Sequence, residues 1–334
     1  MTHAAAGQGL SGRFGIVVVH RSASAYLAVC LQQARRCNPG VPIVLAGDAS
    51  NEALAVDRFV AIDALPRSDA HRRFLQDYRH HSPSQSLEWE RFCIERWFVL
   101  LAVMEREGLD QVLALDSDVL LFCDARQEAL RCSRYAVALS HWDEQRALPH
   151  CTYIQARAAL EEFCREVSRT YASGSHLAEL MARNSKQHGR HWISDMSLWR
   201  AWCRSTGHAV LIRERLPADD ALYDSCIEHV RGFEAVRPLP LLVRPWKRLV
   251  FEQGQAYGFR RANGQRVRLL CVHYHGRFKV LMARHARGQR DGLLAGLLLL
   301  RLKLADLPRK LARLLGSRLR RPPALRRDRS APAP

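Results

Sequence analysis

Two aspartates separated by a single residue, Asp116 and Asp118, follow an apolar run at residues 112–115. In α/β proteins ligands bind where strands end, and two neighbouring carboxylates can hold a hard divalent cation. A cation held there could bridge a diphosphate group. A solvated turn at the end of a strand would contain the same residues, because an isolated Asp-x-Asp triplet is a weak signal.

A second group, His273, Gly276 and Lys279, has the spacing H-x-x-G-x-x-K after an apolar run at residues 269–272. A neutral imidazole is a good ligand for manganese-like ions, and glycine lets the backbone approach a phosphate closely. The lysine supplies a positive charge for a phosphate leaving group. The alternative is a glycine turn after an edge strand, followed by a lysine whose stem lies along the protein surface.

Short apolar runs and helical periodicity predict the elements that must position these groups. Strands are predicted at residues 15–19, 42–46, 59–62, 112–115, 119–122, 135–139 and 269–272. Helices are predicted at residues 25–36, 89–104 with a stop at Gly108, 158–183 and 194–204. This alternation of strands and helices predicts an α/β fold, in which helices cover a sheet that contains parallel strands.

Asp195 lies among three tryptophans, Trp192, Trp199 and Trp202, and follows Ser194, a suitable cap for a helix. Trp199 and Trp202 are three residues apart, which is the spacing of core residues on one helix face, so we expect both in the core. An indole can stack on the apolar face of a sugar ring, so Trp192 is a candidate platform for such a ring. Asp195 could act in a site, or it could simply be a carboxylate that the helix dipole favours.

The chain of 334 residues carries 51 Lys and Arg against 33 Asp and Glu, a formal net charge of +18. The excess is concentrated in residues 284–334, which contain 14 basic and three acidic side chains. We therefore expect an anionic surface to meet this segment rather than the rest of the chain. Arg accounts for 46 of the basic residues. Arg is the better phosphate ligand, but GC-rich coding is the favoured explanation of this excess.

Residues 292–321 are predicted to form two amphipathic helical segments, interrupted at Pro308. In the second segment one stripe consists of leucines, namely Leu307, Leu311, Leu314, Leu315 and Leu319. Arg and Lys occupy most of the remaining positions, and a basic amphipathic helix is typical of an element that lies on a membrane surface. A terminal helix packed on the body or on a partner is the alternative.

Ten cysteines are scattered without a Cys-x-x-Cys pair, which argues against a zinc ribbon or a thioredoxin-type site. Most lie in apolar stretches, as expected of reduced, buried thiols. The N-terminal residues lack the pattern of a signal peptide, and the longest apolar run, at residues 293–300, is too short to span a bilayer. We expect a cytoplasmic protein that is peripherally associated with the inner membrane.

The two constellations, in this order and at this separation, resemble the GT-A glycosyltransferases, above all glycosyltransferase family 8, which includes glycogenin and bacterial lipopolysaccharide galactosyltransferases. The matching segments are VVVHRS at Val17–Ser22, LALDSD at Leu113–Asp118 and VHYHGRFK at Val272–Lys279. The resemblance covers residues 14–282. It implies a single Rossmann-like GT-A domain with a mixed central sheet that binds a nucleotide-sugar.

By this resemblance, the chain divides into three parts: a flexible N-terminus at residues 1–12, the GT-A domain at residues 13–284 and the basic amphipathic tail at residues 285–334. The resemblance also implies a UDP-sugar as donor substrate and Mn²⁺ or Mg²⁺ as cofactor. The implied metal ligands are Asp116, Asp118 and His273. Lys279 would neutralise the departing diphosphate, with Gly276 beside it.

The remaining roles follow from the resemblance alone. The implied donor-binding residues are His20, Arg21, Asp48, Arg96 and Ser117. Asp195 corresponds to the carboxylate beside the sugar, and Arg91 competes with Arg96 for the arginine position. Both arginines could instead be solvated helix charges.

Two departures separate this chain from the family pattern. Met196 follows Asp195 where the family has Gln, and Val280-Leu281 follow Lys279 where Pro-Trp is usual. The retaining or inverting outcome, the donor sugar and the acceptor therefore stay open.

The implied activity is that of a Mn²⁺-dependent glycosyltransferase of the hexosyltransferase type. It would move a sugar to a glycan or lipid-linked acceptor, as in the assembly of bacterial surface polysaccharides. The expected partners are the nucleotide-sugar donor, the acceptor and an anionic membrane surface that the C-terminal tail contacts, and no nucleic acid.

Two other classes compete with this interpretation. A haloacid-dehalogenase-type phosphatase would use Asp116 as its nucleophile and Asp219-Asp220 as its distant acidic pair. That class normally opens with the Asp-x-Asp motif, whereas here the motif follows a complete strand–helix–strand unit, and residues 273–279 stay unexplained. A basic protein that binds nucleic acid or a membrane without catalysis is the second rival, although no nucleic-acid recognition motif is present.

Overall fold

Seven strands form the central sheet of the computed structural model, which describes residues 12–82, 85–188, 193–213 and 221–306. Their order across the sheet is β3 (Arg58–Ala61), β2 (Ile43–Gly47), β1 (Phe14–Val19), β4 (Gln111–Leu115), β7 (Ala147–Ile154), β6 (Val137–His141) and β8 (Val210–Arg213). The first four strands are parallel to one another, whereas β7 is antiparallel to β4 and β6. The predicted α/β fold with a mixed central sheet is confirmed.

The order of the strands brings three strand ends to one edge of this sheet. Ile16 of β1 pairs with Ile43 of β2 on one side and with Leu113 of β4 on the other. The carboxyl ends of these parallel strands therefore meet at one edge, where open α/β sheets bind their ligands.

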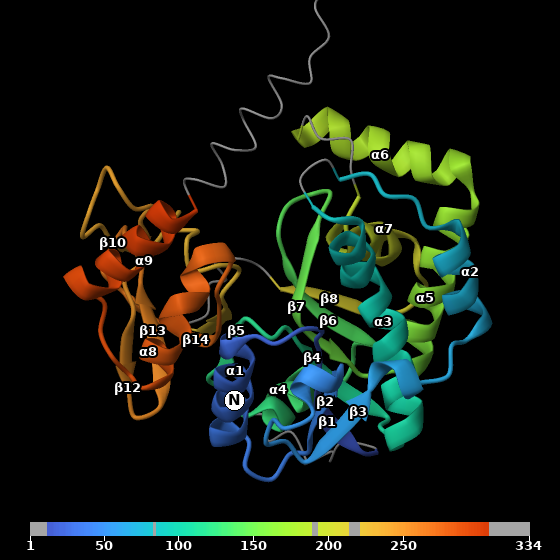
Figure 1. The fold of residues 1–334 in the computed structure, drawn as a ribbon, viewed down its shortest axis with the longest axis horizontal. Coiled ribbons are helices and arrows are strands. Elements are labelled where there is room, and N and C mark those ends of the chain that lie inside the picture. The colour runs from blue at the N-terminus through green and yellow to red at the C-terminus, as the bar shows by residue number, and fades with distance from the viewer. Residues whose placement is uncertain (1–11, 83–84, 189–192, 214–220, 307–334) are drawn as a thin grey trace, which may run out of the picture.

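Helices cover both faces of the central sheet (Figure 1). One face carries α2 (Asp69–Asp77), α3 (Leu87–Glu107), α5 (Arg157–Ala172) and α7 (Asp195–Ser205), with α6 (Gly174–His188) outside them. The other face carries α1 (Ala25–Cys37) and α4 (Ala125–Arg131). Side chains of β1 point alternately to the two faces of the sheet. Val17 packs in the hydrophobic cluster on the side of α3 and α5, whereas its neighbours Ile16 and Val18 pack in the cluster on the side of α1.

A smaller sheet forms a second lobe beside α1 (Figure 1). Its strands are β12 (Val250–Glu252), β13 (Gln255–Phe259), β14 (Arg266–His273), β5 (Val119–Leu121) and β9 (Ala221–Tyr223), the last of which pairs with β14. The pair β10 (Ala235–Val236) and β11 (Trp246–Lys247) lies nearby, with α8 (Met282–Ala286) and α9 (Leu293–Ala305). The short 3-10 segments are η1 (Ala49–Asn51), η2 (Ile62–Ala64) and η3 (Gly276–Leu281).

One antiparallel pair of strands joins the two motifs. In the pairing of β5 with β14, Val119 lies opposite His273. The residue after Asp118 is therefore the ladder partner of the histidine that opens the second motif.

The predicted elements near the motifs match the structure closely. Helix α3 ends at Gly108, whose φ of +60° is the left-handed conformation typical of a glycine after a helix. The predicted helix at 158–183 is instead two helices, α5 and α6, which are separated at Ser173. The strand predicted at 135–139 begins two residues later, at Val137.

Helix α9 differs from the amphipathic segment predicted there. Its Ala295, Gly296 and Leu299 are buried on the second lobe, yet leucines also occupy its exposed side. A Cβ on Gly296 would lie 2.7 Å from Pro238 Cγ, so the loop after β10 packs closely on this helix. Among the described residues, no helix is both long and apolar enough to cross a membrane.

The ten cysteines, all within the described residues, are free thiols. Seven are buried, as expected, and Cys37, Cys93 and Cys203 are partly exposed. Burial raises the pKa of Cys164 and Cys30 above the ordinary thiol value, so these thiols stay protonated.

Candidate active site

The Asp116–Asp118 turn lies between β4 and β5, at the carboxyl edge of the central sheet. The Asp116 N–H donates a hydrogen bond to the carbonyl of His150 at 2.9 Å, and the Tyr274 N–H donates to the carbonyl of Asp118 at 2.9 Å. The second bond attaches the turn to the residues that directly follow β14. Both ends of the turn are therefore held by the backbone.

The Asp118 carboxylate lies between two basic side chains of the second motif. Its Oδ2 is 3.0 Å from Lys279 Nζ, and its Oδ1 is 3.5 Å from His273 Nε2. All three side chains are largely buried. The structure thus brings together Asp118, His273 and Lys279, as the sequence predicted.

The imidazole of His273 is fixed by its surroundings. Its Nδ1 donates a hydrogen bond to the carbonyl of Ser225 at 2.8 Å, so Nε2 is the nitrogen that faces Asp118. The ring of His150 stacks on it with 4.7 Å between the centroids. Asp224 Oδ2 accepts a hydrogen bond from the His273 backbone N–H at 3.4 Å.

Asp224 is itself half of a buried ion pair. Lys247 Nζ lies 2.6 Å from Asp224 Oδ1 and donates another hydrogen bond to the carbonyl of Cys226 at 2.5 Å. The two side chains are only 2% and 1% exposed. This pair fixes the segment that carries Ser225, and therefore the hydrogen-bond acceptor of His273.

The charges in this cluster are strongly coupled. Burial lowers the pKa of His273, but the carboxylate of Asp118 outweighs burial and raises this pKa to about 9. Burial raises the pKa of Asp118, yet His273 and Lys279 together hold it well below its usual range. The pKa of Lys279 rises because the same carboxylate outweighs burial. At neutral pH two cations therefore share one carboxylate, which favours binding of an additional anion.

Lys279 and Gly276 lie on the turn that follows β14. Lys279 Nζ lies 3.4 Å from the hydroxyl of Tyr26 and 4.4 Å from the centre of its ring, so α1 supports the lysine from the other side. Gly276 is exposed and has φ of +57°. No described atom lies within 4 Å of the position that a Cβ would occupy on it, which leaves room for a ligand beside the backbone.

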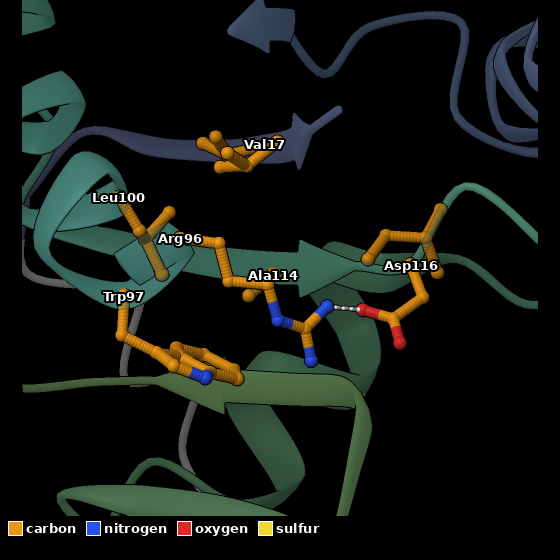
Figure 2. A pocket seen from close by; sticks show the side chains of 8 residues that line it. Val17, Arg96, Trp97, Leu100, Ala114 and Asp116 are labelled. Carbon is orange, nitrogen blue, oxygen red and sulfur yellow. Dashed lines mark hydrogen bonds and ion pairs between the residues drawn. The ribbon is translucent and has the colours of Figure 1, made fainter. Parts of the chain in front are cut away.

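Arg96 connects the first aspartate of the turn to Asp195. One guanidinium nitrogen bonds to Asp116 Oδ1, as Figure 2 shows, and the other lies 2.8 Å from Asp195 Oδ2. The indole N–H of Trp97 donates to the same Asp195 oxygen at 3.3 Å. Burial raises the pKa of Asp116, and Arg96 opposes this effect. Arg96 therefore holds the carboxylates of both Asp116 and Asp195. This pair of contacts was not predicted from the sequence.

The pocket beside Arg96 is small. Its walls are Val17 and Val19 of β1, the end of β4, and one face of α3 that includes Trp97 and Leu100 (Figure 2). Its volume is about 20 Å³, which is enough for one water molecule.

Three of the predicted donor-binding residues, His20, Ser117 and Asp48, follow the strands β1, β4 and β2 and make hydrogen bonds near these strand ends. His20 Nδ1 lies 2.9 Å from the hydroxyl of Ser117, the middle residue of the turn, and its Nε2 lies 3.2 Å from the hydroxyl of Ser24. Asp48 Oδ2 accepts a hydrogen bond from the Ser22 N–H at 2.6 Å. Ser22 has φ of +73°, so Asp48 stabilises a strained loop after β1.

Arg21 points away from the Asp118 cluster. Its guanidinium lies 3.6 Å from Asp63 and 5.0 Å from the centre of the Phe92 ring. The competing Arg91 lies 3.9 Å from Glu95 on its own helix. Of the two helix arginines, Arg96 is the one beside the Asp-x-Asp turn.

The described residues contain no group of three or more His, Cys, Asp and Glu side chains in an arrangement that could hold a metal ion. Asp118 and His273 adjoin, but Asp116 is bound to Arg96. A carboxylate and an imidazole whose second nitrogen is hydrogen-bonded are nevertheless suitable ligands for Mn²⁺ or Mg²⁺. Two of the three metal ligands that the resemblance implies, Asp118 and His273, therefore adjoin, whereas Asp116 pairs with Arg96.

Two of the three tryptophans near Asp195 can be compared with their predicted positions. Trp199 and Trp202 are 0% and 2% exposed, so both belong to the core as predicted. Ser194 occupies the N-cap position of α7, but among the described residues its side chain makes no capping hydrogen bond. Trp192, the pair Asp219-Asp220 and the predicted stripe at 307–319 lie outside the described residues.

Several site residues were not predicted from the sequence. Tyr26 supports Lys279, Lys247 and Asp224 fix the segment before His273, and His150 packs on the His273 ring. None belongs to a motif. The one available signal was Tyr26 on the predicted first helix, which begins shortly after His20.

The chain was compared with known proteins. No family model matches it, and no curated protein matches its sequence. Among solved structures it is similar to mouse xyloside xylosyltransferase 1, with 11% identity and a TM-score of 0.42 over 61% of this chain and 86% of that one. It is also similar to the galactosyltransferase LgtC, with 12% identity and a TM-score of 0.37 over 78% and 87% of the two chains. For the glycosyltransferase GlyE of Streptococcus pneumoniae the identity is 14% and the TM-score 0.34, over 66% and 49%.

All three solved structures are of glycosyltransferases.

Proposed function

We propose that this chain is a metal-dependent glycosyltransferase that transfers a sugar from a nucleotide-sugar, most simply a UDP-sugar, to a glycan or lipid-linked acceptor. The observation that carries the proposal is the cluster of Asp118, His273 and Lys279 at the carboxyl edge of the sheet. A lysine ammonium beside a carboxylate and an imidazole that can hold a cation suits a diphosphate better than it suits a neutral substrate.

Lys279 is the group that acts on the leaving diphosphate. Its ammonium is held between Asp118 and Tyr26, and Gly276 leaves open space at the start of the same turn. Negative charge grows on the diphosphate as the glycosidic bond breaks, so a positive charge fixed there stabilises the transition state more than the ground state.

A divalent cation would be held by Asp118 and His273 together with phosphate oxygens, with Asp116 as the third protein ligand that the resemblance implies. When bound, the cation would neutralise the diphosphate. His273 must lose a proton to serve as a ligand, because a protonated imidazole has no free lone pair. Its Nδ1 hydrogen bond to Ser225 already orients Nε2 toward Asp118.

Asp195 is the candidate carboxylate beside the sugar. Arg96 and Trp97 fix its position through hydrogen bonds to one oxygen, and its other oxygen accepts from the Met196 N–H at 2.9 Å. Arg96 thus acts here as a positioning residue for Asp116 and Asp195. A carboxylate held in this way can stabilise positive charge on a sugar ring.

The test is a donor screen on the full-length protein. We expect release of nucleoside diphosphate from one class of UDP- or GDP-sugar in the presence of Mn²⁺, and no release in excess chelator. The Asp118→Asn variant is expected to lower kcat/KM by on the order of 10²–10³-fold. Asp69→Asn is the matched control, because Asp69 pairs with Arg72 on the surface of α2.

The alternative outcomes separate the rival functions. Full activity of Asp118→Asn, or full activity in chelator, would contradict the proposal. Hydrolysis of a simple phosphomonoester that depends on Asp116, without any transfer of sugar, would favour the phosphatase class. Circular dichroism of each variant excludes a loss of fold as the cause.

A further inference from the structure

Six exposed leucines belong to two segments, α9 and the loop between β10 and β11. Figure 1 shows α9 and β10 on the lobe that holds the second sheet. The six leucines are Leu241 and Leu242 of the loop between β10 and β11, and Leu293, Leu294, Leu297 and Leu304 of α9. We call this set the leucine face. Its members are 47% to 95% exposed, and they are six of the nine large apolar side chains that are exposed within the described residues. Such a concentration marks an interaction surface.

The leucine face belongs to two segments that contact each other, the loop and α9. Each residue of a helix advances by about 100°, so Leu293, Leu297 and Leu304 lie within an arc of about 40° on α9. The loop is attached to the same helix, because Lys303 Nζ donates a hydrogen bond to the carbonyl of Leu242 at 2.9 Å. Pro238 also packs against Gly296. The loop that carries Leu241 and Leu242 is therefore packed on the helix that carries the other four leucines.

The charges around the leucine face are basic. Arg237 and Arg244 on the loop and Arg301 and Lys303 on the helix are exposed. The acidic side chains of α9 and its preceding turn are engaged: Asp291 is bound to His285 and Trp246, and Asp306 to Arg277. An apolar surface with a basic rim is complementary to an anionic lipid bilayer, which offers acyl chains and negative headgroups together.

We propose that the leucine face docks on an anionic lipid bilayer, with Leu241 and the exposed leucines of α9 inserted at the level of the headgroups. Helix α9 has 13 residues and is about 20 Å long, which is too short to cross the hydrocarbon core, so it lies along the surface. This proposal does not depend on the proposed reaction.

The same charges argue against two other occupants. A symmetric second copy would bring two basic rims together, and like charges across an interface are unfavourable. The C-terminal residues 307–334 carry nine basic and one acidic side chain, so the rim repels them as well. A bilayer attracts both the rim and this segment.

The test is co-sedimentation of the full-length chain with phosphatidylcholine vesicles, with and without phosphatidylglycerol. The variant is Leu241→Ser/Leu293→Ser/Leu297→Ser. The matched control is Leu87→Ser/Leu130→Ser, which removes exposed leucines from α3 and α4. We expect the wild type and the control to bind the anionic vesicles, and the face variant to bind on the order of tenfold less tightly. Arg237→Glu/Arg301→Glu should weaken the preference for phosphatidylglycerol without abolishing it, because the basic residues of 307–334 remain.

Two further measurements identify the occupant. Hydrogen exchange with and without vesicles should protect residues 237–244 and 293–304. Sedimentation velocity without vesicles should give the same species for the wild type and the face variant. Unchanged vesicle binding of the face variant would overturn the proposal, as would protection confined to other segments. A dimer that the face variant dissociates, without vesicle binding by the wild type, would assign the face to a second copy instead.

Discussion

The buried pair of Lys247 and Asp224 permits a sharp prediction about stability. Both side chains are almost completely excluded from solvent, and their charged atoms are 2.6 Å apart. Lys247→Met keeps the length of the side chain but leaves the charge of Asp224 without its partner. Removing one member of a buried ion pair costs about 3–5 kcal/mol, because the remaining charge loses its compensation.

This free energy can be converted into a melting temperature. Unfolding entropy is about 2.1 cal/mol/K per residue, so about 300 folded residues give roughly 0.6 kcal/mol/K. Lys247→Met should therefore lower Tm by about 5–8 °C. The assay is thermal and urea unfolding of the full-length chain, followed by circular dichroism.

A double variant separates loss of charge compensation from loss of packing. Lys247→Met/Asp224→Leu removes both charges, and we expect its stability to lie within about 2 kcal/mol of the wild type, since apolar replacement of a buried pair is often nearly neutral. Arg165→Ala is the surface control. Its partner Glu161 is 52% exposed, so the cost should stay below about 1 kcal/mol. If the double variant were as unstable as Lys247→Met, an uncompensated charge would not be the cause, and the reasoning would be refuted.

Three further predictions concern other parts of the molecule. Lys279→Ala should lower kcat more than it raises the donor KM, with partial recovery in Lys279→Arg; steady-state kinetics of sugar transfer would contradict this if only KM changed. Burial raises the pKa of Glu95, but its hydrogen bond with His71 and neighbouring charges hold the pKa below the ordinary 4.5. Glu95 therefore stabilises the fold above pH 4.5, and this contribution is lost as the pH falls through the lowered pKa. Glu95→Gln should make the decrease of Tm on acidification less steep. The same decrease of Tm with pH in the variant and the wild type would refute this role of Glu95. A Cβ on Gly47 would lie 2.8 Å from Asn51 Oδ1, so Gly47→Ala should cost about 1–3 kcal/mol in urea unfolding, and a neutral result would mean that the loop shifts freely.

Local signals explain which parts of the fold could be predicted. Helix α3 has a serine cap, since the Ser86 hydroxyl accepts from the Trp89 N–H, and it ends at Gly108, so both ends are visible in the sequence. Strand β7 was not predicted. Its eight residues contain Pro149, His150 and Thr152, and their burial depends on insertion between β4 and β6. A strand of this composition is defined by its neighbours and not by its own propensity.

The residues of the candidate site likewise include some that could be predicted from the sequence and some that could not. Asp118, His273 and Lys279 could be predicted because each belongs to a motif at the end of an apolar run. The bond between Arg96 and Asp195 could not, since the two residues are far apart in sequence and each resembles an ordinary helix charge. Lys247 was equally hidden, because nothing in a sequence distinguishes a buried lysine from an exposed one.

The ion pairs of the site also bear on how a donor would bind. Asp118 holds Lys279 in place, so the lysine is ordered before any phosphate arrives. An anion that binds Lys279 exchanges one partner for another, and therefore the side-chain entropy of ordering the lysine is not lost again on binding. Arg96 is different, because both of its partners are carboxylates of the protein and it lies beside a pocket for a single water. Of these two cations, Lys279 is thus the one that we propose to meet a phosphate, whereas Arg96 holds Asp116 and Asp195 in position.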